Sequence, residues 1–139
     1  MANSVKQTTN DVYLDDNSVV RCVYHGRQTA ITLLETTTKI LEIMRGLVEK
    51  DEPVRLLADI RDLSDYDQPS RIVEMQARTA LPFWKMAFVT SGLPTTGEKV
   101  SRTLTSMSGR KSEIRYFRRE DDAIGWLSFM SNRRHATAN

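Results

Sequence analysis

Residues 54–75, Val54-Arg-Leu-Leu-Ala-Asp-Ile-Arg-Asp-Leu-Ser-Asp-Tyr-Asp-Gln-Pro-Ser-Arg-Ile-Val-Glu-Met75, decide the fold of this chain. The nearly continuous apolar run Val54–Ile60 predicts an interior strand that is covered on both faces. An acid-rich loop follows, and then a helix from Ser70 to Leu81 that Pro82 ends. Functional groups often lie just past the carboxyl end of such a strand. The aspartates near that edge therefore mark a candidate site: Asp59, Asp62, Asp65 and Asp67.

The residues before this stretch predict a hairpin and a long helix. Val12–Leu14 and Val19–His25 are rich in β-branched and aromatic residues, and residues 15–18 between them are typical of a turn. Thr29 is expected to cap the helix that follows. The helix has one apolar stripe at three- and four-residue spacing, which is expected to face the core. Its members are Ala30, Leu33, Leu34, Leu41, Met44, Leu47 and Val48.

The residues after this stretch continue the alternation of strands and helices. Met86–Thr90 predicts a buried strand, and Thr95 with Glu98 forms a capping-box pattern for a third helix that ends before Gly109. Glu113–Phe117 predicts a last strand, and acidic residues 120–122 suit the first turn of a last helix. The order β-β-α-β-α-β-α-β-α predicts a single α/β domain with a mixed sheet of about five strands and about four helices.

Composition limits the class of protein. A chain of 139 residues fits one domain, expected over residues 11–130, with a flexible N-terminus at residues 1–10 and a flexible tail at residues 131–139. Twenty basic and eighteen acidic residues give a formal net charge of +2, which does not favour nucleic-acid binding. The single cysteine, Cys22, suits a reducing cytoplasm. Neither a signal peptide nor an apolar run of about 20 residues is present, so we expect a soluble cytoplasmic protein.

The ordered set of elements and residues resembles the SpoIIAA-like family, whose fold is related to STAS domains and to the Sec14-type lipid-binding fold. The resemblance rests on Glu52–Asp59 at the end of the long helix, Asp62-Leu63, Trp84–Val89 and Ile114–Leu127. The last segment joins an aromatic strand end to acidic residues and then to Ala-x-x-Trp-Leu on a helix. The resemblance implies a STAS-like α/β fold and a non-enzymatic role in bacterial regulation or protein binding, without a cofactor.

The same resemblance implies a candidate for phosphorylation. In STAS regulators the loop after the equivalent strand ends in a phosphorylated serine, within the context Asp-Ser-Ser-Gly. Ser70 is the nearest counterpart, with Ser64 as a second candidate, although this chain reads Asp67-Gln-Pro-Ser-Arg71 and lacks the glycine. Phosphate on Ser70 would place negative charge at a helix N-terminus near Arg71.

Other chemical interpretations of the same residues fit less well. The spacing of the aspartates does not match a calcium loop, so no metal site is predicted. Asp59 and Thr90 at neighbouring strand ends mimic part of a receiver domain, but the last strand ends in arginines where a receiver has lysine. Gly92–Lys99 nearly forms a phosphate-binding loop, but Glu98 occupies the position where that motif has its lysine. No catalytic residue is predicted.

Three functions remain open at this point. The first is a non-catalytic interaction module whose contact surface runs from Ser64 to Arg71. Its candidate loop residues are Asp65, Asp67 and Arg71 in this range and Asp62 just before it. Its partner would be another protein, with a homodimer as an alternative. The second is a binding module for a small apolar, lipid-like ligand, which requires a cavity between the sheet and the helices. The third is a phosphate-handling enzyme that uses the loop from Ser91 to Lys99.

Overall fold

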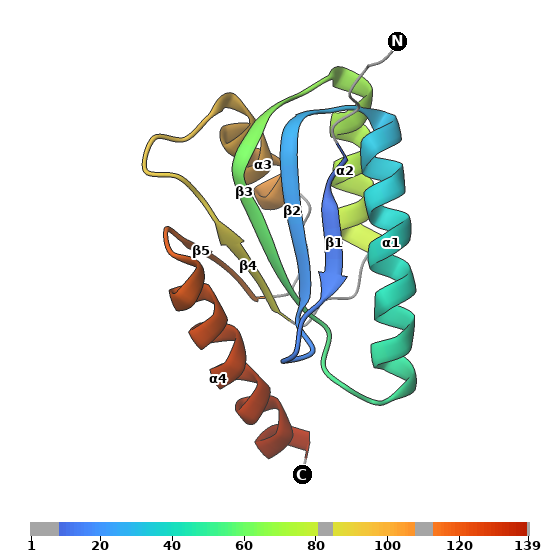
Figure 1. Cartoon of the computed structure of the whole chain (residues 1–139), viewed down its shortest axis with the longest axis vertical. Helices are drawn as coiled ribbons and strands as arrows, with labels where there is room; N and C mark the ends of the chain where they lie inside the picture. Colours follow the sequence, from blue (N-terminus) through green and yellow to red (C-terminus); the bar gives the residue numbers. More distant parts are fainter. Residues whose placement is uncertain (1–8, 81–84, 108–112, 139) are drawn as a thin grey trace.

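The computed structural model describes residues 9–80, 85–107 and 113–138 (Figure 1). Its strands are β1 (Asp11–Leu14), β2 (Val20–Gln28), β3 (Arg55–Tyr66), β4 (Lys85–Val89) and β5 (Glu113–Phe117). Its helices are α1 (Ala30–Glu49), α2 (Gln68–Ala80), α3 (Thr96–Met107) and α4 (Glu120–Ala138). The strands lie in the order β1-β2-β3-β4-β5. Strand β1 is antiparallel to β2, and all other neighbours are parallel, which confirms the predicted mixed sheet.

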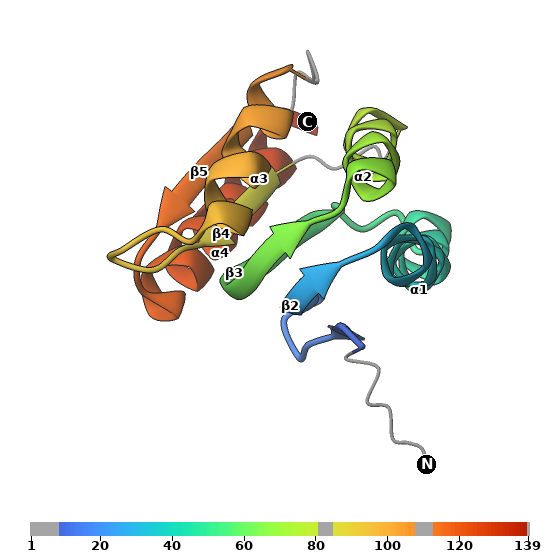
Figure 2. The ribbon, with the colours of Figure 1, turned by 90° about the horizontal axis from the view of Figure 1, so that it is seen from above.

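The sheet separates two layers of helices, as Figure 2 shows from above. Helices α1, α2 and α3 pack beside one another on one face, and α4 covers β3, β4 and β5 on the other. Alternate side chains of β3 pack against the helices on the two faces of the sheet. Leu56 and Ala58 belong to the larger core, which includes residues of α1 and α3. Leu57, between them, belongs to a smaller core with Ala123 and Leu127 of α4.

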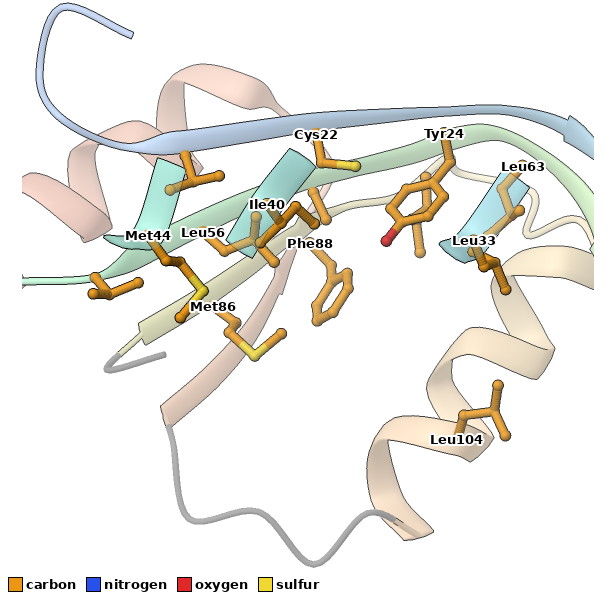
Figure 3. Close-up of a cluster of buried hydrophobic side chains, with 14 of the residues drawn as sticks. Cys22, Tyr24, Leu33, Ile40, Met44, Leu56, Leu63, Met86, Phe88 and Leu104 are labelled. Carbon is orange, nitrogen blue, oxygen red and sulfur yellow. The ribbon is translucent and has the colours of Figure 1, made fainter. Parts of the chain in front are cut away.

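The larger core holds α1 and α3 on the sheet, as Figure 3 shows. Val73 of α2 is partly buried against the same core. Leu33, Ile40 and Met44 of α1 meet buried residues of the central strands, such as Phe88 of β4. Phe88 also stacks on Tyr116 of β5, with ring centroids 5.3 Å apart. Burial of an aliphatic or aromatic side chain of this size contributes about 1.5–3 kcal/mol, so this face supplies most of the driving force for folding.

Strand β3 is longer than the sequence pattern predicts. The predicted strand ends at Ile60, whereas β3 continues to Tyr66. The register between β2 and β3 shifts twice in this region, between Val23 and His25 and between Gly26 and Arg27. Each shift adds a residue to β3, so that its buried residues fall at intervals of three: Ile60, Leu63 and Tyr66. This spacing hides the two-residue period of a strand, which is why the segment resembles a loop in sequence.

Helix α1 begins where it was predicted to begin but buries a different set of residues. Thr29 caps it, and Thr32 completes a reciprocal pair of hydrogen bonds with Thr29. The buried stripe is Leu33, Thr36, Ile40, Met44 and Leu47. The prediction was wrong for three of its members, Leu34, Leu41 and Val48, which are exposed by 56%, 38% and 59%. Each of them directly follows a core residue of α1. One residue along a helix is a rotation of about 100°, which turns these three side chains away from the sheet.

The ends of the described chain also differ from expectation. Asn10, expected in a flexible N-terminus, is buried, and its side chain hydrogen bonds to Gln28 and Thr36. Helix α4 continues to Ala138, through the expected tail, because residues 128–138 contain neither glycine nor proline to end it. The predicted helix end at Leu81 and Pro82, the landmark Trp84 and the helix stop at Gly109 lie outside the described residues. Within those residues, no helix is long and apolar enough to cross a membrane.

Candidate functional site

The four aspartates of the candidate site do not form one cluster. Since β3 extends to Tyr66, three of them lie within the strand, and Asp67 alone lies in the connection to α2. Three of their side chains, those of Asp59, Asp62 and Asp67, bind three different groups of the chain. Among the described residues, no group of three or more acidic, histidine or cysteine side chains could hold a metal ion.

Asp59 belongs to a chain of ion pairs on the α4 side of the sheet. Its carboxylate accepts hydrogen bonds from Nε and Nη2 of Arg61 at 2.9 and 2.7 Å. Arg61 lies 3.9 Å from Glu120 at the start of α4, and Glu120 in turn binds Arg21 of β2. Burial alone would raise the pKa of Asp59, but the hydrogen bonds and charge of Arg61 outweigh it and hold that pKa below its usual value. Asp59 is therefore an ionised structural partner that fixes Arg61.

Asp62 forms a second group with His25 and Asp11. The imidazole of His25 lies between the two carboxylates, with Nδ1 3.0 Å from Asp62 and Nε2 2.9 Å from Asp11. Both ring nitrogens face acceptors, so the geometry favours the doubly protonated ring. The hydrogen bonds to Asp11, and then to Asp62, raise the pKa of His25 above 6.5 despite some burial. This group joins three strands, because Asp11 begins the edge strand β1 and Asp62 lies on β3.

The stability of the protein is expected to depend on pH through His25. Because the folded state raises its pKa, its stabilising contribution is complete below pH 6.5 and is lost as the pH rises through the folded value. The ion pairs are largely exposed, so the loss should not exceed about 1 kcal/mol. Urea unfolding at several pH values should show the stabilities of wild type and His25→Gln converging above neutrality. A titration midpoint of the His25 ring at or below 6.5 by NMR would contradict the expectation.

Asp67 fixes the first turn of α2. Its Oδ1 accepts a hydrogen bond from the backbone N–H of Ser70 at 3.0 Å, as an N-cap residue does. The hydroxyl of Ser70 donates to the Asp67 carbonyl oxygen at 2.7 Å, and Ser70 is fully buried. A kinase would reach Ser70 only if this turn opened, whereas Ser64 is exposed on β3. Phosphorylation of either serine stays a prediction.

The predicted contact surface from Ser64 to Arg71 is only partly accessible. Ser64, Gln68, Pro69 and Arg71 are exposed, whereas Asp65 and Asp67 are half-buried. The Oδ1 atom of Asp65 is buried and has no hydrogen-bond partner among the described residues. The following residue, Ile72, is 58% exposed. The accessible surface therefore centres on the first turn of α2.

The residues of the receiver-like pair and of the phosphate-loop pattern form hydrogen bonds to other groups of the chain. Thr90 donates its backbone N–H to the carbonyl oxygen of Phe117 at 2.7 Å, while Asp59 is held by Arg61. The buried carboxylate of Glu98 accepts the backbone N–H of Ser91 at 3.1 Å and the Ser91 hydroxyl at 2.7 Å. A carboxylate of the protein thus occupies the strand-to-helix turn where a phosphate would bind. Only half of the predicted capping box forms, since Thr95 accepts from the Glu98 N–H but Glu98 binds Ser91.

A groove of about 640 Å³ lies on α1, rather than between the sheet and the helices. It is lined by residues of mixed polarity: Thr9, Leu34, Glu35, Thr38, Lys39 and Glu42. An apolar ligand was expected to need a cavity between the sheet and the helices. This groove does not have the expected position.

Glu120, Arg21, His25 and Asp11 were not recognised as site residues. Each pairs with a residue far away in sequence; Arg21 and Glu120 are 99 positions apart. Glu120 was assigned to the favourable end of the α4 dipole, and that position alone did not indicate an ion pair with β2.

These contacts define a single-domain α/β protein with a mainly parallel sheet, one helix on its second face and paired charges at its carboxyl edge. The SpoIIAA-like family model matches residues 21–128, and the chain belongs to this family. A solved structure with the same fold is an uncharacterised protein of the DUF3478 family from Shewanella loihica PV-4. It is 16% identical, with a TM-score of 0.63 over 91% of this chain and 99% of that chain. No curated protein matches.

Proposed function

We propose that this protein is a non-catalytic interaction module that binds another protein through the first turn of α2. The observation that carries the proposal is the exposed pair Arg71 and Ile72 on a turn that hydrogen bonds already fix. A preordered turn loses little conformational entropy on binding. Arginine is also enriched at protein interfaces, and an exposed aliphatic side chain supplies apolar contact.

The ionic contacts beside this turn support a structural role for the acidic edge. Asp59, Asp62 and Asp67 are each bound to a group of the same chain, which orients the surface around them. A reducing, cytoplasmic location is part of the proposal, because the single cysteine, Cys22, is buried and has no second cysteine with which to form an intrachain disulfide. Regulation by phosphate would act on this surface through Ser64, which is exposed, or through opening of the turn at Ser70.

The proposal is tested by affinity capture from the native cell with the doubly substituted protein Arg71→Glu, Ile72→Ala. Both side chains are exposed, so the variant should keep the stability of the wild type to within about 0.5 kcal/mol. Mass spectrometry should identify at least one protein that wild type retains and the variant loses. The same spectra would report phosphate on Ser64 or Ser70.

The matched control is Arg119→Glu, Phe129→Ala, which changes one exposed arginine and one exposed apolar residue of the α4 layer. This control should retain the partner. Recovery of the same proteins by the wild type and both variants would remove the first turn of α2 as the contact surface. Loss of the partner from both variants would show an effect that is not specific to α2.

A further inference from the structure

Strand β5 lies at the end of the sheet, and one of its edges has no partner strand among the described residues (Figure 2). The Phe117 carbonyl oxygen accepts the backbone N–H of Thr90, so the backbone groups of Phe117 face β4. Successive residues of a strand direct their N–H and C=O groups to opposite edges. The backbone groups of Ile114 and Tyr116 therefore form the β5 edge, where no described residue hydrogen bonds with them.

Apolar side chains on both faces of the sheet are only half-buried at the β5 edge. Ile114 and Tyr116 are partly buried against the larger core, whereas Phe117 and Trp126 are partly buried against the smaller one. Every residue of the neighbouring strand β4 is buried, which is the condition of a strand with partners on both sides. A further strand beside β5 would therefore cover apolar surface on both faces as well as bond its backbone.

The exposed arginines around the β5 edge have no ion pair among the described residues: Arg102, Arg115 and Arg118. Arg102 of α3 lies over the Tyr116 ring, with its Cζ atom 3.9 Å from the ring centroid. On the other face of the sheet, the Cζ atom of Arg115 lies 5.4 Å from the centroid of Trp126. Contact with a ring holds a guanidinium group in place and leaves its N–H donors available to an anion.

The acidic residues of this region do not cancel that charge. Residues 110–119 contain five basic residues and one acidic residue. Of the acidic residues on β5 and in the first turn of α4, only Asp122 has no ion pair among the described residues. The others lie beside cations of the same chain: Glu113 beside Lys85, Glu120 beside Arg21, and Asp121 beside Arg119. The charge left unpaired at the β5 edge is therefore positive.

We propose that the β5 edge binds an extended acidic segment of another protein, which would add a strand to the five-stranded sheet. The backbone of that segment would bond with Ile114 and Tyr116. Its side chains would alternate between the two faces of the sheet, so that carboxylates on one face reach Arg102 and those on the other reach Arg115. This edge is separate from the first turn of α2 and does not depend on the function proposed for that turn.

The binding test uses a synthetic peptide of about eight residues in which pairs of valine alternate with pairs of glutamate, so that both faces of the strand carry carboxylates. A second peptide carries lysine in place of each glutamate. A third keeps the glutamates but has N-methyl groups on its central residues, which removes backbone donors without changing the charge. By fluorescence anisotropy at about 0.05 M salt, the full-length protein should bind the first peptide at least about tenfold more tightly than either of the others.

A double variant tests the two ring-bound arginines. Arg102→Gln, Arg115→Gln should reduce the preference for the glutamate peptide over the lysine peptide to less than about threefold. The matched control is Lys39→Gln, Arg45→Gln, which removes the same charge from exposed positions of α1 and should bind as wild type does. Circular dichroism establishes that each variant is folded before its binding is compared.

Two further measurements separate the β5 edge from the surface of α2. Arg71→Glu, Ile72→Ala should bind the glutamate peptide as wild type does, because it leaves the β5 edge unchanged. Hydrogen exchange of the wild type should become slower at the amides of Ile114 and Tyr116 when the glutamate peptide is bound, since these amides would then donate to it.

The proposal is overturned if the glutamate and lysine peptides bind equally, if the N-methylated peptide binds as tightly as the unmodified one, or if none binds to the folded protein. Tighter binding of a single-stranded oligothymidylate than of the glutamate peptide would also overturn it, because the arginines would then serve a nucleic acid. So would a dimer by light scattering in which the amides of Ile114 and Tyr116 are already protected, since a second copy would cover the edge. A monomer with the expected peptide preference supports the proposal.

Discussion

Replacement of Gly97 by alanine is expected to destabilise the protein by about 3 kcal/mol, the upper part of the range for overpacked sites. A Cβ atom at this position would lie 2.6 Å from the carbonyl oxygen of Leu63 and 2.7 Å from its Cγ. The first of these atoms is backbone, so the clash cannot be relieved by rotation of a flexible side chain. Urea unfolding should show a lower midpoint with an unchanged dependence on denaturant.

Gly46→Ala is the matched control, because Gly46 lies inside α1 and a Cβ there meets nothing within 4 Å. Alanine should stabilise that helix by about 0.5–1 kcal/mol. If Gly97→Ala were as stable as Gly46→Ala, the close approach of α3 to β3 would be wrong. Hydrogen exchange at the start of α3 would then show no loss of protection.

The close approach at Gly97 explains why β3 can extend beyond its neighbour. The pairing of β3 with β4 ends at Asp59 and Val89, so the rest of β3 has no strand beside it on that edge. The start of α3 lies there instead, with Gly97 against Leu63 and the Thr95 hydroxyl donating to the Leu63 carbonyl oxygen. This contact satisfies an acceptor that a strand would otherwise have bonded.

The order of elements could be predicted because each has a strong local pattern. Thr29 precedes a long stripe of apolar residues, and the run Val54–Ile60 is typical of an interior strand. The end of β3 could not be predicted, because its register shifts arise from pairing with β2, which is a contact between distant segments. The exposure of Leu34 and Leu41 was missed for a related reason. The spacing of apolar residues shows which side of α1 faces the core, but the contact with the sheet and α2 decides how many residues on that side are buried.

The sequence predicted the edge of the sheet at which these aspartates lie, but not all of the contacts that their side chains make. Asp59, Asp62 and Asp67 do lie at the carboxyl end of the sheet. Two of their three contacts are local: Asp59 binds Arg61 two residues away, and Asp67 binds the backbone of Ser70 three residues away. An N-cap aspartate before a Pro at the helix start is a recognisable signal in the sequence. The contact of Asp62 with His25 joins residues 37 positions apart, and sequence spacing does not relate them.

Replacement of Asn10 by alanine is expected to destabilise the protein by about 2–3 kcal/mol, as for a buried polar group that leaves its partners unsatisfied. The Asn10 amide donates to Gln28 Oε1 and Thr36 Oγ1, both at 2.8 Å. Its carbonyl oxygen accepts from the backbone N–H of His25 at 2.9 Å and from Gln28 Nε2 at 3.1 Å. One side chain therefore joins the segment before β1 to β2 and α1, and no apolar replacement supplies these bonds.

The matched control is Asn17→Ala, which makes the same chemical change at an exposed site. The hydrogen bonds of Asn17 are made by its backbone N–H and carbonyl oxygen, which the substitution keeps. This variant should change the free energy of unfolding by less than about 0.5 kcal/mol. In Asn10→Ala the amide of His25 should also exchange faster with solvent, since its acceptor is lost. Equal stability of the two variants would mean that solvent replaces the Asn10 amide. The segment before β1 would then be as loosely attached as its polar sequence suggests, and β1 would depend on its pairing with β2 and its packing on the core.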